Sequence, residues 1–83
     1  MKVSSHISWQ KILFNVYIID EENDSIIRID DIAADIWLMI NNKKHITDIV
    51  RKICEEYEVE YREALEDVNN FIDDMVSKRY LER

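Results

Sequence analysis

The apolar residues of this chain change their spacing near residue 30, and that change limits the folds open to it. Up to that point the apolar side chains follow a period of two, which is typical of strands. Beyond it they recur at steps of three and four residues, which is typical of amphipathic helices. The order predicts a small N-terminal antiparallel β-sheet of two to three strands followed by three α-helices, an α+β domain of winged-helix-like type.

The extended part divides into two predicted strands and a weaker one. Residues 12–19 are rich in β-branched and aromatic side chains on both faces, which favours a strand that is central or covered on both sides. A polar stretch at residues 21–24 predicts a turn, and residues 25–29 predict a second strand joined to the first as a hairpin. A weaker strand, with Ile7 and Trp9 on one face, precedes them.

Each predicted helix carries one apolar stripe. The first begins after a cap at Asp30, the second after a cap at Thr47, and the third runs from residue 61 to about residue 78. The stripes consist of Ile32, Ala33, Ile36, Trp37 and Ile40; of Ile49, Val50, Ile53, Cys54 and Tyr57; and of Ala64, Leu65, Val68, Phe71, Ile72, Met75 and Val76. We expect the tail, Tyr80-Leu81, to pack against the domain.

The chain contains neither glycine nor proline. Without glycine it cannot form a glycine-rich phosphate loop, either of the P-loop or of the dinucleotide-binding kind. Tight turns need residues that tolerate the left-handed backbone conformation, and after glycine Asn and Asp tolerate it best. We therefore expect every tight turn to be made by Asn or Asp, including a left-handed end of the first helix at Asn41-Asn42.

Size and composition indicate one small globular domain over residues 1–83. Hydrophobic residues make up 47% of the chain and charged residues 35%, a balance that does not suit a disordered segment. No run of 18 apolar residues is present, so we expect no membrane span. The N-terminus lacks the apolar stretch of a secretory signal, so we expect a cytoplasmic protein.

Catalytic and metal-binding patterns are missing. His6 and His45 lie on different predicted elements, and neither stands in a recognisable nucleophile motif. Cys54 is the only cysteine, so it has no partner for a disulfide or a Cys-x-x-Cys metal pair. Because adjacent acids on a helix point in different directions, the paired carboxylates do not form chelating pairs. We expect no catalytic residue, no metal site and no cofactor.

DNA binding is the alternative that a winged-helix-like topology raises. A reading helix needs several basic or amide side chains on its exposed face. Arg51 and Lys52 on the second predicted helix are flanked by acids, and the net charge of −7 repels phosphate. A DNA-binding transcriptional regulator and a structural subunit of an enzyme complex remain as alternatives, and we expect no nucleic-acid partner.

Five short motifs in a fixed order resemble a known family. They are RIDDIAADIW at residues 28–37, ITDIV at residues 46–50, Tyr57, DV-x-x-FI at residues 67–72, and Tyr80-Leu81. The series resembles the PqqD family, the peptide chaperones of pyrroloquinoline-quinone biosynthesis, over roughly residues 10 to 82. The family often has Asn where Asp30 stands, and a glycine-containing turn at residues 41–44. Asp30 can cap a helix as Asn does, and the residues at 41–44 can form a turn without glycine.

The resemblance implies a non-catalytic adaptor in the maturation of ribosomally synthesised peptides. Such a domain binds the leader segment of a precursor peptide and presents it to a tailoring enzyme, in this branch a radical S-adenosylmethionine enzyme. The leader adds as a strand to residues 25–29, in a groove whose other wall is the third helix. The implied peptide-binding residues are Ser25, Ile26, Ile27, Arg28, Ile29, Ala64, Val68, Phe71, Ile72 and Met75.

These residues differ in how well they suit a groove. Val68 and Ile72 equally suit the core, whereas we expect Phe71 and Met75 to lie to one side of the apolar stripe and to contact the leader. Arg28 is expected either to pair with an acidic leader residue or to keep the sheet soluble.

Overall fold

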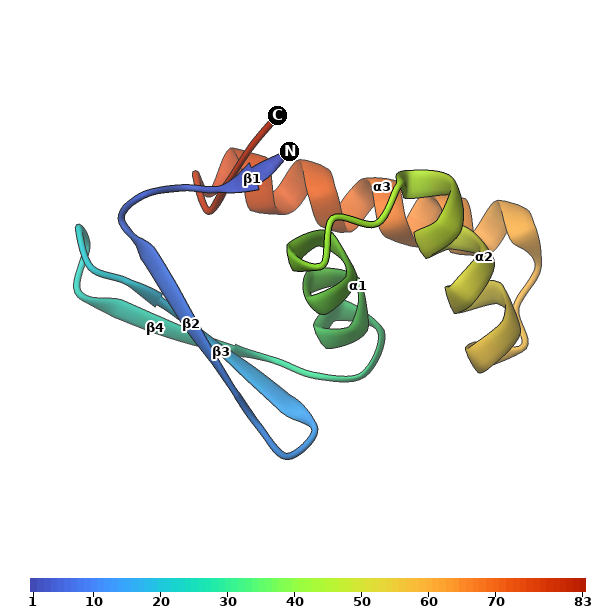
Figure 1. The fold of residues 1–83 in the computed structure, drawn as a ribbon, viewed down its shortest axis with the longest axis horizontal. Coiled ribbons are helices and arrows are strands. Elements are labelled where there is room, and N and C mark those ends of the chain that lie inside the picture. The colour runs from blue at the N-terminus through green and yellow to red at the C-terminus, as the bar shows by residue number, and fades with distance from the viewer.

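The computed structural model describes residues 1–83 and shows a sheet at one end of the molecule and three helices at the other (Figure 1). The elements are β1 (Lys2–Val3), β2 (Ile7–Ile12), β3 (Asn15–Asp20), β4 (Ser25–Ile29), α1 (Asp31–Asn41), α2 (Ile46–Tyr57), α3 (Tyr61–Ser77) and β5 (Leu81–Glu82). The change from strands to helices near residue 30 is confirmed, and so is the α+β class.

The main sheet is an antiparallel meander in the order β2-β3-β4. The strand predicted at residues 12–19 is wrong at its beginning. A two-residue turn at Leu13 and Phe14 splits that segment, so Ile12 ends β2 and Asn15 begins β3. Both turn residues are large and apolar, and neither is a residue type that signals a hairpin turn. The central place predicted for the segment is confirmed for β3.

A second, two-stranded sheet joins the two ends of the chain. Val3 of β1 pairs with Leu81 of β5, and the Ser4 amide donates to the Tyr80 carbonyl at 3.0 Å. Tyr80 and Leu81 are buried, which confirms that the tail packs against the domain. Each of these strands has only two residues, too few for a periodic pattern to predict it.

The helix boundaries agree with expectation at α1 and α3 but not at α2. Asp30 is the N-cap residue of α1, although its side chain makes no capping hydrogen bond. Thr47 does not cap α2, because that helix begins one residue earlier, at Ile46, after His45. The α3 helix starts at Tyr61 as expected.

The expectation that only Asn and Asp make the tight turns is wrong. Positive φ angles occur at Asp24 and Asp31, but also at four residues of other types: Leu13, Lys43, Glu58 and Arg79. At the end of α1, Lys43 rather than Asn42 takes the left-handed conformation. The Lys43 amide donates to the Ile40 carbonyl at 3.1 Å and the Lys44 amide donates to the Met39 carbonyl at 3.1 Å.

The end of α3 repeats this pair of bonds. The amide of Arg79 donates to the Val76 carbonyl at 3.0 Å, and the amide of Tyr80 donates to the Met75 carbonyl at 2.9 Å. Both helices therefore end in a Schellman motif without glycine. The hydrogen bonds offset the cost of about 1–2 kcal/mol that a side chain pays in this conformation.

One apolar core connects the sheet to the helices. It holds 16 buried side chains, and Trp37 of α1 is fully buried within it. The rings of Trp9 on β2 and Trp37 meet edge to face, with their centroids 6.4 Å apart. Through this contact α1 packs on the inner face of the sheet, which leaves the outer face and the outer edges of β2 and β4 without a neighbouring element.

Candidate functional site

The strand β4 lies at the edge of the main sheet, as predicted for residues 25–29. Its inner edge pairs with β3 from Val16–Ile29 to Asp20–Ser25, and no strand covers its outer edge. An uncovered edge presents a row of amide and carbonyl groups that can bind an extended chain. The β4 strand is therefore a ready template for one more strand.

The two faces of β4 differ in burial. Ser25, Ile27 and Ile29 are half-buried and share a face with the buried side chains of β3, and both isoleucines pack against the core. Ile26 and Arg28 point to the outer face, where 65% of the Ile26 surface is exposed. The guanidinium of Arg28 lies 3.5 Å from the Asp30 carboxylate and 3.4 Å from the Asn15 amide oxygen.

The five residues expected from α3 do not form one open wall. Ala64, Val68, Ile72 and Met75 are buried in the core, and Phe71 alone is half-buried. Met75 therefore does not lie to one side of the apolar stripe, because a rotation of about 100° per residue places it between Ala64 and Val68 in the middle of the buried face. Phe71 does lie on a flank of that face.

Phe71 and Val76 lie on opposite flanks of α3, because five residues turn a helix by about 140° from the first side chain to the last. Val76 lines a surface hollow of about 440 Å³ together with residues of the β1–β2 link, Glu22 and the C-terminal end of the chain. The Phe71 flank is separate from that hollow. Phe71 of α3 and Ile27 and Ile29 of β4 are each half-buried and packed against the same core.

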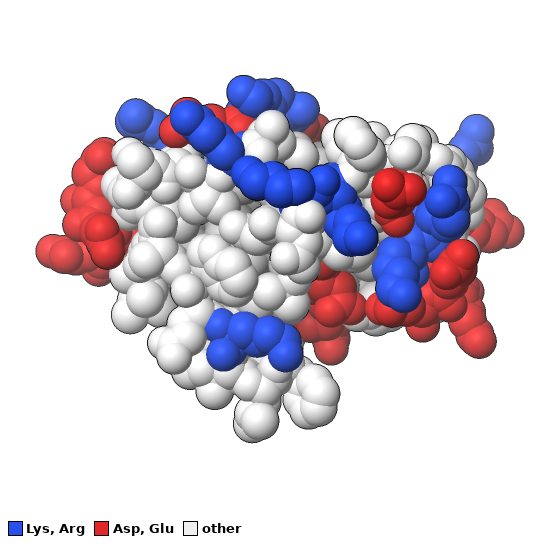
Figure 2. Space-filling model, in the orientation of Figure 1, with Lys and Arg blue, Asp and Glu red and all other residues white.

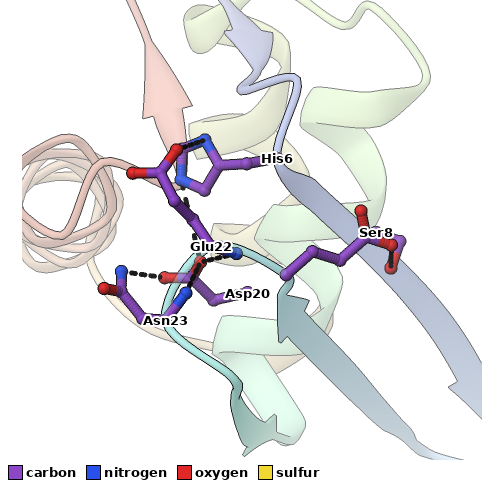
Figure 3. Close-up of polar contacts among 6 residues, drawn as sticks. His6, Ser8, Asp20, Glu22 and Asn23 are labelled. Carbon is purple, nitrogen blue, oxygen red and sulfur yellow. Dashed lines mark hydrogen bonds and ion pairs between the residues drawn. The ribbon is translucent and has the colours of Figure 1, made fainter.

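The turn between β3 and β4 is organised by Asp20, which is buried (Figure 3). Its carboxylate accepts hydrogen bonds from the Asn23 side chain at 2.8 Å and from the backbone amides of Glu22 and Asn23 at 3.0 and 3.1 Å. The Asn23 hydrogen bond is the main reason that the pKa of Asp20 lies below its ordinary value, although burial opposes that shift. These bonds fix the point at which β4 begins.

His6 lies against this turn from the β1–β2 link. One ring nitrogen is 4.0 Å from the Asp20 carboxylate and the other is 4.0 Å from the Glu22 carboxylate (Figure 3). These contacts place the imidazole between the link and the turn. The other histidine, His45, is exposed in front of α2, and Cys54 is half-buried on that helix.

The tip of the β2–β3 hairpin is a second exposed apolar feature. The exposed fractions are 48% for Ile12, 78% for Leu13 and 85% for Phe14, and the tip projects at the bottom of Figure 2 as a mostly uncharged end. Interpreting these residues as strand concealed the tip. The three consecutive large apolar residues were the signal that could have revealed it.

A surface hollow of about 250 Å³ lies beside this tip. Phe14 and Lys11 of the hairpin line it together with Asp35 and Leu38 of α1 and Tyr57 of α2. The Tyr57 hydroxyl donates to the Asp35 carboxylate at 2.5 Å. Burial and this carboxylate both raise the pKa of the Tyr57 phenol far above its ordinary value, so Tyr57 stays a neutral donor that ties α2 to α1.

The exposed face of α2 is a poor surface for phosphate. Arg51 forms an ion pair with Asp48 at 3.4 Å, and Lys52 forms one with Glu56 at 3.3 Å. No observation thus favours the DNA-binding alternative. The structure also shows no group of three or more His, Cys, Asp or Glu side chains placed to hold a metal ion, and no helix long and apolar enough to cross a membrane.

Comparisons with known proteins show one matching family model and one shared fold. A family model described as coenzyme PQQ synthesis protein D (PqqD) matches residues 15–81. The solved structure of TbiB1 in complex with the TbiA(beta) leader peptide is 26% identical to this chain, with a TM-score of 0.92 over 99% of this chain and 95% of that chain. None of the curated proteins matches the sequence.

A second solved structure supports the fold alone, because its sequence identity is only 19%. It is lasso peptide synthetase B1 complexed with the leader peptide, and its TM-score is 0.87 over 94% of this chain and 92% of that chain. The arrangement of a three-stranded sheet followed by three helices is thus shared with two proteins whose structures contain leader peptides.

Proposed function

Because this chain belongs to the PqqD family, we propose that it is a non-catalytic adaptor that binds the leader segment of a ribosomally synthesised precursor peptide and presents it to a tailoring enzyme. The open edge of β4, with half-buried isoleucines packed on the core at its inner face, carries this proposal. The match to TbiB1, whose structure holds a leader peptide, supports the same function. Residues 1–83 act as one recognition domain in the cytoplasm, where precursor peptides are made.

The bound leader forms a fourth strand of the main sheet next to β4. Backbone hydrogen bonds exchange for bonds to water and contribute only about 1 kcal/mol each, so they give affinity with little dependence on sequence. Specificity comes from side chains that meet Ile27, Ile29 and Phe71 on the inner face. Of the α3 residues in the site, Phe71 makes direct contact, while Ala64, Val68, Ile72 and Met75 form the floor on which it rests.

The tailoring enzyme supplies the chemistry. The histidines and the cysteine of this chain lie in three separate places, and His6 lies beside two carboxylates. By family resemblance the partner is a radical S-adenosylmethionine enzyme. The adaptor itself then holds no cofactor, and its role is to raise the local concentration of the precursor at the enzyme.

Titration of a cognate precursor peptide, sought among the short open reading frames beside the gene, tests the proposal. We expect Phe71→Ala to weaken binding by roughly 1–3 kcal/mol, because it removes an apolar anchor. Tyr61→Ala is the matched control, since Tyr61 is an exposed aromatic residue at the start of the same helix and should leave affinity unchanged. Hydrogen exchange should show new protection along Ser25–Ile29 when the peptide is bound.

Two results together would refute this site. They are an unchanged affinity of Phe71→Ala, with circular dichroism showing a folded variant, and an absence of new protection in β4. If the peptide still binds and both results are obtained, the peptide lies on another surface, such as the apolar hairpin tip.

A further inference from the structure

A surface hollow of about 270 Å³ lies on the outer face of the sheet, where β3 turns into β4. It is lined by Ile19, Asp20, Glu21, Asp24, Ser25 and Ile26. Ile26 is 65% exposed, and it pairs across the strands with the half-buried Ile19, so the two form an open apolar floor. Neither side chain belongs to the core, and no element of the chain covers them.

The rim of this hollow is acidic. Asp20 is engaged in the turn, but Glu21 and Asp24 are exposed and neither forms an ion pair. Figure 2 shows acidic side chains gathered at this end of the molecule, which Figure 1 identifies as the β3–β4 turn. An apolar floor with an uncompensated acidic rim complements a side chain that has an apolar stem and a cationic head.

We propose that a peptide bound along β4 places a lysine or arginine side chain in this hollow, an inference that rests on the proposed function. The basic residue is the outward-facing one that pairs with Ile26. Directly opposed side chains on an antiparallel pair lie about 5 Å apart, and diagonal neighbours lie within about 8 Å. The methylene stem therefore covers Ile26 and extends toward Ile19, which lies two strand spacings of about 4.8 Å each from the added strand. The charged head meets Asp24 first and Glu21 beyond it.

The other outward-facing residue of β4 restricts the basic residue to this end. Arg28 lies two positions from Ile26 on the same face, so a second cation opposite Arg28 would meet a like charge. A slip of one residue would turn the basic side chain to the inner face, against Ile27 and the core. The hollow thus selects both the register of the leader and its class, a segment with one cation at the end beside Ser25.

Selection from a library of random dodecapeptides on the immobilised chain tests this inference. Peptides that bind wild type should share a lysine or arginine at a fixed distance from a pair of apolar residues. With Glu21→Lys that preference should disappear or change to an acidic residue, and Asp24→Asn should weaken it. Glu66→Lys is the matched control, because Glu66 is exposed on α3, carries no ion pair and changes the net charge equally.

The contribution of the basic residue to affinity is then measured with one selected peptide and with its variant that has serine in place of that residue. Titrated into wild type, the serine variant should bind roughly threefold to tenfold more weakly, and the gap should narrow at high salt because exposed ion pairs are screened. In the double variant Glu21→Lys/Asp24→Asn the two peptides should bind with equal affinity.

The outcomes separate this inference from the proposed function. Suppose that the selected peptides lose binding with Phe71→Ala. If they then show no preference for a basic residue, or if that preference survives Glu21→Lys, the inference about the hollow fails while peptide binding at β4 stands. If no enriched peptide depends on Phe71 and none protects β4 from exchange, the proposed function fails as well.

Discussion

At the scale of single residues, buried polar groups explain how a chain without glycine makes a tight turn beside its candidate site. Asp20 takes the place of a flexible residue by accepting three hydrogen bonds from the turn that follows it. Its carboxylate is nearly covered by protein, so these bonds are its alternative to solvation. The start of β4, and with it the register of any added strand, depends on one ionised side chain.

The free energy of unfolding should therefore depend on pH through the protonation of Asp20. Its folded pKa lies below the unfolded value of about 4, so its contribution is fully present above pH 4 and is lost as the pH falls through the folded pKa. We expect Asp20→Ala to be less stable than wild type at pH 7 and to lose less stability below pH 4. Urea unfolding between pH 2.5 and 7 measures this, and Glu66→Ala, which removes an exposed acid of α3 that forms no ion pair, should keep the wild-type pH profile.

Trp37 should tolerate a smaller ring better than its complete burial suggests. Its indole Nε1 is buried without a hydrogen-bond partner. Trp37→Ala removes a large core side chain and should cost about 3–5 kcal/mol, enough to unfold many domains of this size. Trp37→Phe removes the unpaired N–H as well and should cost clearly less than Trp37→Ala. Chemical denaturation followed by circular dichroism ranks the variants, and an equal loss for both would argue against this account.

At the scale of elements, the helix ends show how the chain bears backbone conformations that its residues disfavour. Two helices end in paired hydrogen bonds with lysine or arginine in the left-handed position, and α2 ends with Glu58 at a φ of 53°. The path of the chain to the next element sets the backbone conformation at the end of each helix. A residue type that adopts this conformation at lower cost should therefore raise the free energy of unfolding.

Glu58→Gly should therefore stabilise the protein by about 0.5–1 kcal/mol, because glycine reaches the left-handed region without steric cost. Glu55→Gly is the internal comparison. It places the same substitution inside α2 at another exposed position, where it should destabilise by about 1 kcal/mol. Thermal unfolding of both variants gives opposite signs if this account is right, and a loss of stability in both would show that Glu58 has contacts worth more than the conformational gain.

At the scale of the whole molecule, a short clasp between the two ends of the chain completes the core. The β1 and β5 strands meet at the C-terminal end of α3 (Figure 1), and Leu81 is buried between the helix and Val3. The clasp closes the fold at the end where the β1–β2 link carries His6 onto the β3–β4 turn. The position of β4 thus depends on contacts made far from it in the sequence.

Leu81→Ala should cost about 2–4 kcal/mol, as truncation of a buried leucine does. Val3→Ala should cost less, because Val3 is only half-buried. In the double variant the two losses should fall short of their sum by about 0.5–1 kcal/mol, since paired residues share one contact. A double-mutant cycle in urea measures that coupling. Strict additivity would mean that β1 and β5 stabilise the protein independently.

The sequence by itself determined the fold class, the residue range of β4 and the approximate bounds of α1 and α3. Burial of one face of an element imposes a period on its apolar residues, and that period can be recognised within a short segment. It also identified Phe71 as a flank residue. It did not reveal the turn at Leu13 and Phe14 or the β1–β5 pairing, because apolar turn residues look like strand and two-residue strands have no period.

Only the tertiary structure decided which apolar residues stay exposed to solvent. Ala64, Val68, Ile72 and Met75 share the pattern of Phe71 along the chain, but the folded core covers them and leaves Phe71 half-buried. The hollow beside Ile26 likewise depends on the pairing of β3 with β4, which brings Ile19 next to Ile26 and both next to the acidic turn. Periodicity reports which residues avoid water, whereas the contacts that cover them are set by elements distant in sequence.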